Sequence, residues 1–76
     1  MALRLSNRLR VARAEGRLSQ ERLAEMVGVT RQTICSIETG QYGPSALLAF
    51  SLAKQLHKRV DEVFFLEGDS NEDDER

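Results

Sequence analysis

Two short helical patterns separated by a brief break are the feature that most constrains the fold of this sequence. The segment "SQERLAEMV" (19–27) repeats apolar residues with helical spacing, and "TRQTICSIET" (30–39) does so again after Gly28. Ser19 and Thr30 stand where helix N-caps are expected, and glycine favours the end of a helix. A connection this short predicts two helices joined by a tight turn.

Three further helices are predicted around this pair. The first follows a cap at Ser6 or Asn7 and ends near Gly16, which can take the left-handed conformation that stops helices. A longer helix begins after Ser45 and repeats leucine at every fourth position. Residues 60–64 suit a short fifth helix packed on the core.

The two ends of this body can meet. Residues 2–5, "ALRL", alternate in polarity and can pair with "FFLE" (64–67) as a short antiparallel ribbon. The sequence thus predicts the all-α class: a compact five-helix domain over residues 1–67 that allows a two-stranded ribbon joining its termini.

Charge divides the 76-residue chain into two parts. Residues 1–66 carry 10 Lys and Arg against 6 Asp and Glu, a balance of +4, whereas residues 67–76 carry 6 acids against Arg76, a balance of −5. The second part is polar and has no periodic spacing of apolar residues, so it cannot bury enough apolar surface to offset the entropy of ordering it. We therefore expect residues 68–76 to form a disordered acidic tail.

Composition excludes several classes of protein. Cys35 and His57 are the only cysteine and histidine, which leaves no disulfide within the chain and too few soft ligands for a zinc site, so no metal or cofactor is expected. No apolar run reaches the ~18 residues of a membrane helix, and a cytoplasmic location is expected. No set of acid, base and nucleophile suggests an enzyme. The small size of the chain favours a dimer.

The second helix of the pair buries little of itself. If Ile34 and Ile37 define its buried side at about 100° per residue, the opposite side is centred on Gln32 and Ser36, with Arg31 at the flank of the first turn. An α-helix fits the major groove of B-DNA, where Gln pairs with adenine, Arg with guanine and hydroxyls with several base edges. The pattern indicates a base-reading helix, and an ordinary solvated helix surface is the alternative that periodicity leaves open.

Several short motifs together carry a resemblance to a known family. They are "SQ" opening the helix over 19–27, "LAE" inside it, "GVT" in the turn, "RQTI" opening the next helix, "IETG" closing it, and "YGPS" before a long amphipathic helix. Over about residues 6–66 the sequence resembles the helix-turn-helix of the Cro and phage-repressor type, the XRE family, and especially its minimal stand-alone bacterial regulators. This resemblance implies a five-helix domain that binds double-stranded operator DNA, commonly as a two-fold dimer.

The resemblance also implies roles for individual residues. It places Arg31, Gln32, Thr33 and Ser36 against bases. The expected phosphate contacts are Gln20, Arg8, Arg10, Thr39, Gln41 and Tyr42, of which the two arginines follow from the basic cluster in the first helix. Arg13 matches an arginine that pairs with the glutamate of "IETG", here Glu38. We expect this pair to be structural because Glu38 lies nearer the buried side of its helix than the groove side.

A homodimer interface is predicted near the C-terminal end of the folded region, residues 1–67. The apolar residues that exceed what one small core needs are Leu47, Phe50, Phe64, Phe65 and Leu66. Two-fold pairing through them would make the operator an inverted repeat with half-sites ~34–36 Å apart.

Four positions depart from the family pattern. Many relatives carry Lys or Arg where Ser36 stands, Arg or Asn where Thr39 stands, and Lys where Gln41 stands, so phosphate attraction is expected to be weaker here. His57 stands where relatives often have a helix-ending glycine, which predicts a strained or shifted helix end.

The sequence therefore predicts a sequence-specific DNA-binding transcriptional regulator, and in particular a repressor. An antitoxin and a restriction-modification control protein use the same fold and remain open. A protein-interaction module that has lost DNA binding is the alternative from another class, which the net charge of −1 keeps open. The acidic tail either weakens DNA binding or only keeps the protein soluble.

Overall fold

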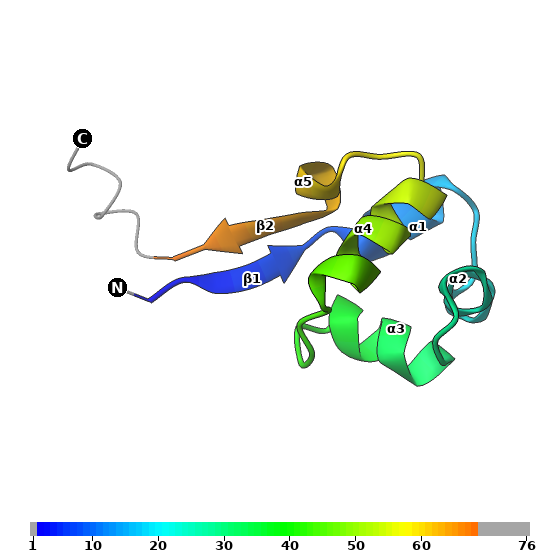
Figure 1. Ribbon diagram of the computed structural model, residues 1–76, viewed down its shortest axis with the longest axis horizontal. Coiled ribbons are helices and arrows are strands. Elements are labelled where there is room, and N and C mark those ends of the chain that lie inside the picture. Colours follow the sequence, from blue (N-terminus) through cyan, green and yellow to red (C-terminus); the bar gives the residue numbers. More distant parts are fainter. Residues whose placement is uncertain (1, 69–76) are drawn as a thin grey trace.

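The computed structural model describes residues 2–68 as five helices and one two-stranded ribbon (Figure 1). In chain order the elements are β1 (Arg4–Asn7), α1 (Leu9–Glu15), α2 (Gln20–Val27), α3 (Arg31–Glu38), α4 (Ala46–Gln55), α5 (Val60–Val63) and β2 (Phe64–Glu67). The predicted five-helix architecture and a ribbon between the two ends are both confirmed, but the first strand of the ribbon is residues 4–7 and not the predicted residues 2–5. Apart from Gly68, the predicted acidic tail lies outside the described residues. No helix within residues 2–68 is long and apolar enough to cross a membrane.

Side-chain caps begin three of the helices where the sequence predicts them. The hydroxyl of Ser19 accepts the Arg22 N–H at 2.9 Å, and Thr30 and Ser45 cap α3 and α4 in the same way. Each cap satisfies one of the backbone N–H groups that the first turn of a helix leaves without a partner. The start of each of these three helices is therefore set by local sequence.

The first helix begins and ends differently from the prediction. It starts at Leu9 with Arg8 as its N-cap, one or two residues later than predicted, because Ser6 and Asn7 belong to β1, where they lie opposite Phe65 and Phe64. At its end Gly16 has a φ of −86°, and the left-handed conformation falls on Arg17 instead, with a φ of 58°.

His57 also takes the left-handed conformation, with a φ of 59° directly after the last turn of α4. This is the strained helix end that the sequence predicts at this position. A glycine here would remove the steric conflict between the side chain and the backbone.

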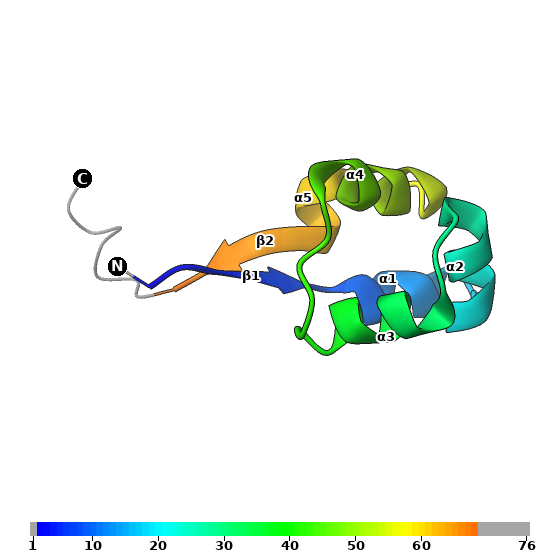
Figure 2. The same cartoon turned by 60° about the horizontal axis from the view of Figure 1, so that its bottom comes forward.

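The ribbon joins the two ends of the described chain. β1 and β2 pair antiparallel with Leu5 opposite Leu66 and Arg4 opposite Glu67, and the charged pair is 3.4 Å apart. The ribbon lies at one end of the long axis of the molecule and α2 at the other (Figures 1 and 2).

Each helix contributes to one hydrophobic core. The largest side chains that are fully buried are Leu9, Leu23, Ile34, Ile37, Leu52 and Val63, and they come from all five helices. Phe64 is also buried, at 7% exposure. Its predicted place at a dimer surface is therefore wrong, because the first residue of β2 still belongs to the core.

Candidate nucleic-acid interface

A tight turn fixes α3 against α2. Gly28 ends α2 with a φ of 78°, and the Val29 N–H donates to the Ala24 carbonyl oxygen at 3.0 Å. Val29 then packs against the core, and Thr30 caps α3. A side chain at position 28 would be strained because L-residues rarely adopt a positive φ. The turn therefore holds α3 at a defined angle to α2.

The two faces of α3 differ as the periodicity predicts. Ile34 and Ile37 are fully buried, whereas Arg31 and Gln32 are exposed on the first turn. Gln32 donates from Nε2 to the Ser36 hydroxyl at 3.3 Å, one turn further along the outer face. The exposed face of α3 thus presents a guanidinium, an amide and a hydroxyl, all of which can bind base edges.

The loop after α3 folds back on its last turn. The N–H groups of Gln41 and Tyr42 both donate to the Ser36 carbonyl oxygen, at 2.9 and 3.2 Å. Thr39 donates its hydroxyl to the same carbonyl at 3.2 Å, and Gly40 allows the turn with a φ of 84°. Thr39, Gln41 and Tyr42 are exposed. The structure therefore brings these three predicted phosphate contacts to the C-terminal end of α3.

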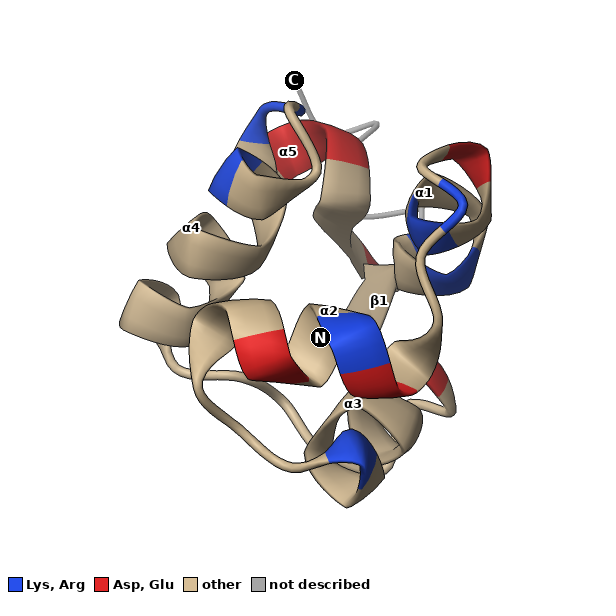
Figure 3. Ribbon diagram, turned by 90° about the vertical axis from the view of Figure 1, so that its right-hand side faces the viewer, with Lys and Arg blue, Asp and Glu red and all other residues tan. Residues whose placement is uncertain are grey.

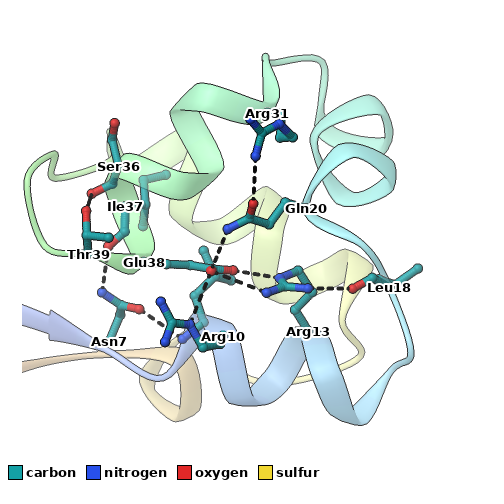
Figure 4. Close-up of polar contacts among 11 residues, drawn as sticks. Asn7, Arg10, Arg13, Leu18, Gln20, Arg31, Ser36, Ile37, Glu38 and Thr39 are labelled. Carbon is teal, nitrogen blue, oxygen red and sulfur yellow. Dashed lines mark hydrogen bonds and ion pairs between the residues drawn. The ribbon is translucent and has the colours of Figure 1, made fainter.

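A buried carboxylate lies behind α3. The side chain of Glu38 has no solvent exposure, and Arg13 donates to it from Nε at 2.7 Å and from Nη2 at 3.4 Å (Figure 4). Gln20 donates to Glu38 Oε1 at 3.0 Å, and Arg10 lies 3.6 Å from the same oxygen. Arg13 also donates to the Leu18 carbonyl oxygen at 2.8 Å. This cluster joins the first three helices around one negative charge.

The carboxyl group of Glu38 stays ionised in this setting. Burial raises its pKa, but hydrogen bonds from Arg13 and Gln20 and the positive charges of Arg13 and Arg10 together outweigh burial. The pKa of Glu38 is therefore lowered from its ordinary value of 4.5. Within the described residues every buried side-chain nitrogen or oxygen has a hydrogen-bond partner.

Gln20 connects this buried cluster to the exposed first turn of α3. Arg31 donates from Nη1 to Gln20 Oε1 at 3.1 Å, while the other end of the same amide contacts Glu38. The sequence predicts a phosphate contact for Gln20 and gives no sign of this double contact. Neither contact is signalled by helical spacing, because the partners are 11 and 18 residues away.

Asn7, which the sequence predicts only as a possible cap of the first helix, also contacts α3. Its side chain donates to the Ile37 carbonyl oxygen at 2.9 Å and accepts the Leu9 N–H at 3.0 Å. The same amide thus gives the first N–H group of α1 a partner and attaches the ribbon to the last turn of α3 (Figure 4). Its partner on α3 is 30 residues away in the sequence.

Arg8 and Arg10, the two remaining predicted phosphate contacts, have different neighbours in the structure. Arg10 is exposed and lies beside Glu38, on the side of α1 that faces α3. Arg8 instead stacks on the ring of Phe65 at 5.0 Å and lines a groove between α1 and α5 with Lys58 and Asp61. Figure 3 shows basic positions on α1 and at one end of α3, with mixed charge on α2. Of the two arginines, Arg10 is therefore the one near α3.

Taken together, these features define a class of protein: an all-helical domain in which a tight turn and a buried ion cluster hold one short helix with its polar face outward. The sequence model of the helix-turn-helix family matches residues 9–63. An uncharacterized HTH-type transcriptional regulator of Bacillus subtilis, YgzD, is 46% identical over 63 residues, which is 83% of this chain and 96% of that protein.

Two solved structures show the same fold. The restriction-modification controller protein C.AhdI from Aeromonas hydrophila has a TM-score of 0.69 at 36% identity, covering 72% of this chain and 80% of that one. The P22 c2 repressor, crystallised with a synthetic operator, has a TM-score of 0.68 at 30% identity, covering 71% and 82%. The chain belongs to the helix-turn-helix family of DNA-binding transcriptional regulators, of the Cro and phage-repressor (XRE) type. This is a class of DNA-binding proteins and not of enzymes.

Proposed function

We propose that this protein is a sequence-specific repressor that places α3 in the major groove of an operator. The observation that carries the proposal is the exposed polar face of α3, held outward by two fully buried isoleucines and by the turn after Gly28. The likeness to the P22 c2 repressor, whose structure contains operator DNA, supports this docking. Binding alone is enough to repress by occlusion, and a protein acting in this way works in the cytoplasm.

The exposed side chains suit distinct parts of the duplex. Arg31 and Gln32 lie on the first turn of α3, the part of a recognition helix that usually contacts bases, and Thr33 and Ser36 add hydroxyls beside them. Arginine suits guanine and glutamine suits adenine. The phosphate contacts would come from residues on the flanks of α3, namely Arg10, Gln20, Thr39, Gln41 and Tyr42. The N-terminus of α2 adds backbone N–H groups and a positive dipole end.

Exposed apolar side chains support a homodimer. Leu47, Phe50 and Leu66 are 78%, 60% and 64% exposed. The first two lie on α4, which packs on α5, and α5 runs directly into the strand that carries Leu66. Phe65 is half-buried beneath Arg8. Covering the three exposed side chains in a two-fold dimer would remove them from water and impose an inverted repeat on the operator.

Selection from a library of randomised duplexes tests the proposed function. The expected result is an enriched inverted repeat whose binding weakens steeply with salt, because neutralised phosphates release counterions. The control is Gln32→Ala together with Arg31→Ala, which should bind but no longer enrich the same repeat. An absence of salt-dependent binding to any duplex would contradict the proposal and leave a protein-interaction module as the better account.

A restriction-modification controller is a second candidate function, favoured by the 36% identity to C.AhdI. It uses the same DNA-binding surface and differs in its target. A selected repeat that lies upstream of a neighbouring restriction-modification operon would support this role over that of a general repressor.

A further inference from the structure

Asn7 joins the ribbon to the last turn of α3. Its Nδ2 group donates to the Ile37 carbonyl oxygen at 2.9 Å, and its Oδ1 atom accepts the Leu9 N–H at 3.0 Å (Figure 4). Both bonds need the same orientation of the amide, because a carbonyl oxygen only accepts hydrogen bonds and an N–H group only donates them. Within residues 2–68, no other hydrogen bond connects the ribbon to α3.

Close packing does not by itself fix the angle between the ribbon and α3. A pocket of about 240 Å³ lies between the ribbon, α3 and the loop after it, and its lining includes Leu5, Ile37, Tyr42 and Phe64. Fully interlocked side chains would leave no such space. The directional bond from Asn7 therefore supplies a constraint that packing leaves open.

The ribbon is anchored to the core at its inner end. Phe64 is buried there and lies opposite Asn7. From this point the two strands extend away from the helices along the long axis of the molecule (Figures 1 and 2). Leu66 is two residues further out, at ~7 Å. A rotation of the ribbon about Phe64 would therefore stretch the bond from Asn7 to Ile37 and move Leu66 relative to α3.

We propose that Asn7 is a positioning residue that determines the half-site spacing which the dimer accepts. Its hydrogen bond holds the ribbon, and with it the apolar surface at Leu66, at one angle to α3. This inference rests on the proposed function, in which Leu66 lies at the two-fold interface and α3 enters the major groove. Each added base pair moves a half-site by ~3.4 Å and turns it by ~34°, so a dimer that holds both copies of α3 rigidly rejects a wrong spacing.

The alternative is that Asn7 only stabilises the fold, and the two roles have different consequences. Loss of stability weakens binding to every duplex by the same factor. A looser ribbon instead lets the dimer adapt to wrong spacings, which reduces their disadvantage relative to the right one. The distinguishing quantity is therefore the ratio of affinities between the selected repeat and repeats that are one base pair longer or shorter.

The test measures these ratios for wild type, Asn7→Asp and Asn7→Ser. Both substitutions keep an acceptor for the Leu9 N–H, but aspartate has no N–H group to donate and the serine side chain is too short to reach Ile37. Each should reduce the ratios by about tenfold and leave the base preferences within a half-site unchanged.

Ser6→Asp is the matched control for the charge. It adds a carboxylate at the neighbouring residue, on the other face of the ribbon, and should keep the wild-type ratios. Wild-type ratios in both Asn7 variants would overturn the proposal, as would an equal loss in Ser6→Asp.

A measurement without DNA separates failure of this inference from failure of the proposed function. Residual dipolar couplings report the orientations of backbone N–H groups in the free protein. In wild type, the couplings of the ribbon and of α3 should fit one common alignment, whereas Asn7→Ser should reduce those of the ribbon alone because the ribbon then samples a range of angles. Unchanged couplings in Asn7→Ser would overturn the positioning role, whether or not the protein binds DNA. A wild type that selects no inverted repeat would reject the proposed function, and the couplings would still decide whether Asn7 holds the ribbon.

Discussion

Arg13 on α1 makes a two-point ion pair with the buried Glu38 on α3, with distances of 2.7 Å from Nε to Oε2 and 3.4 Å from Nη2 to Oε1. The pair closes the interface between these helices because Glu38 has no solvent exposure and Arg13 has 17%. Such a pair adds little by itself, but removing one partner leaves a buried charge without compensation.

Arg13→Ala should therefore lower the free energy of unfolding by about 3 kcal/mol at neutral pH. Urea denaturation followed by circular dichroism measures this change. The matched control is Arg22→Ala, which removes the partner of the exposed Glu25 at 3.2 Å and should change stability by less than about 1 kcal/mol. Equal effects of the two substitutions would contradict the structural role given to Arg13.

The stabilisation from Glu38 should depend on pH in a defined direction. The folded state lowers the pKa of Glu38 below its ordinary value of 4.5, so the folded protein releases this proton more readily than the unfolded chain. The contribution is complete above the ordinary value and is lost as pH falls through the lowered pKa. The difference in unfolding free energy between wild type and Glu38→Gln should thus be constant near neutral pH and shrink below pH 4.5. A difference that grows on acidification would mean that the pKa is raised.

Gln32 should determine base specificity, whereas Arg10 should determine overall affinity for DNA. Gln32→Ala should relax the preference at one base pair by ~1–3 kcal/mol because a bidentate contact to a base edge is lost. Arg10→Ala should weaken binding to all sequences alike and reduce the slope of affinity against salt. Competition with single-base variants of the selected duplex measures both effects. A Gln32→Ala profile identical to that of wild type would rule out the proposed docking of α3.

The proposed dimer should dissociate when a charge enters its apolar surface. Phe50→Asp and Leu66→Asp should each be monomeric in sedimentation at micromolar concentration, because a buried unpaired carboxylate opposes association. Val11→Asp is the control, since Val11 is similarly exposed at 56% but lies on α1 in the charged groove. Dissociation by Val11→Asp, or a monomeric wild type, would reject this interface.

The acidic residues after Gly68 should weaken non-specific DNA binding at low salt. The prediction comes from their charge alone, because residues 67–76 have a balance of −5 against +4 for residues 1–66. Replacing the acids from Asp69 to Glu75 by their amides should tighten binding to a random duplex at low salt. The affinities of the two proteins should converge at higher salt, where interactions between charges are screened beyond ~8 Å. Equal affinities at every salt concentration would leave solubility as the role of these residues.

Local sequence was enough to predict the helix pair and the faces of α3. The caps at Ser19 and Thr30, the break at Gly28 and the periodic isoleucines all act within a few residues, so their effects can be found by reading along the chain. The same reasoning predicted a ribbon that joins the two ends, because alternating segments suit a strand, but it placed the first strand at residues 2–5, whereas residues 4–7 pair with 64–67 in the structure.

The tertiary structure decided how distant residues share one site. Phe64 is buried in the core although it is the first residue of the ribbon strand β2, and Arg8 faces α5 because Phe65 lies beside it. The two contacts of Gln20 and the bridge from Asn7 to α3 span 11 to 30 residues. Such contacts leave no period in the sequence, since they depend on the angles at which separately formed helices pack. The sequence by itself therefore determined which helix presents its polar face, and the packing of the other elements decided how the side chains on that face are held.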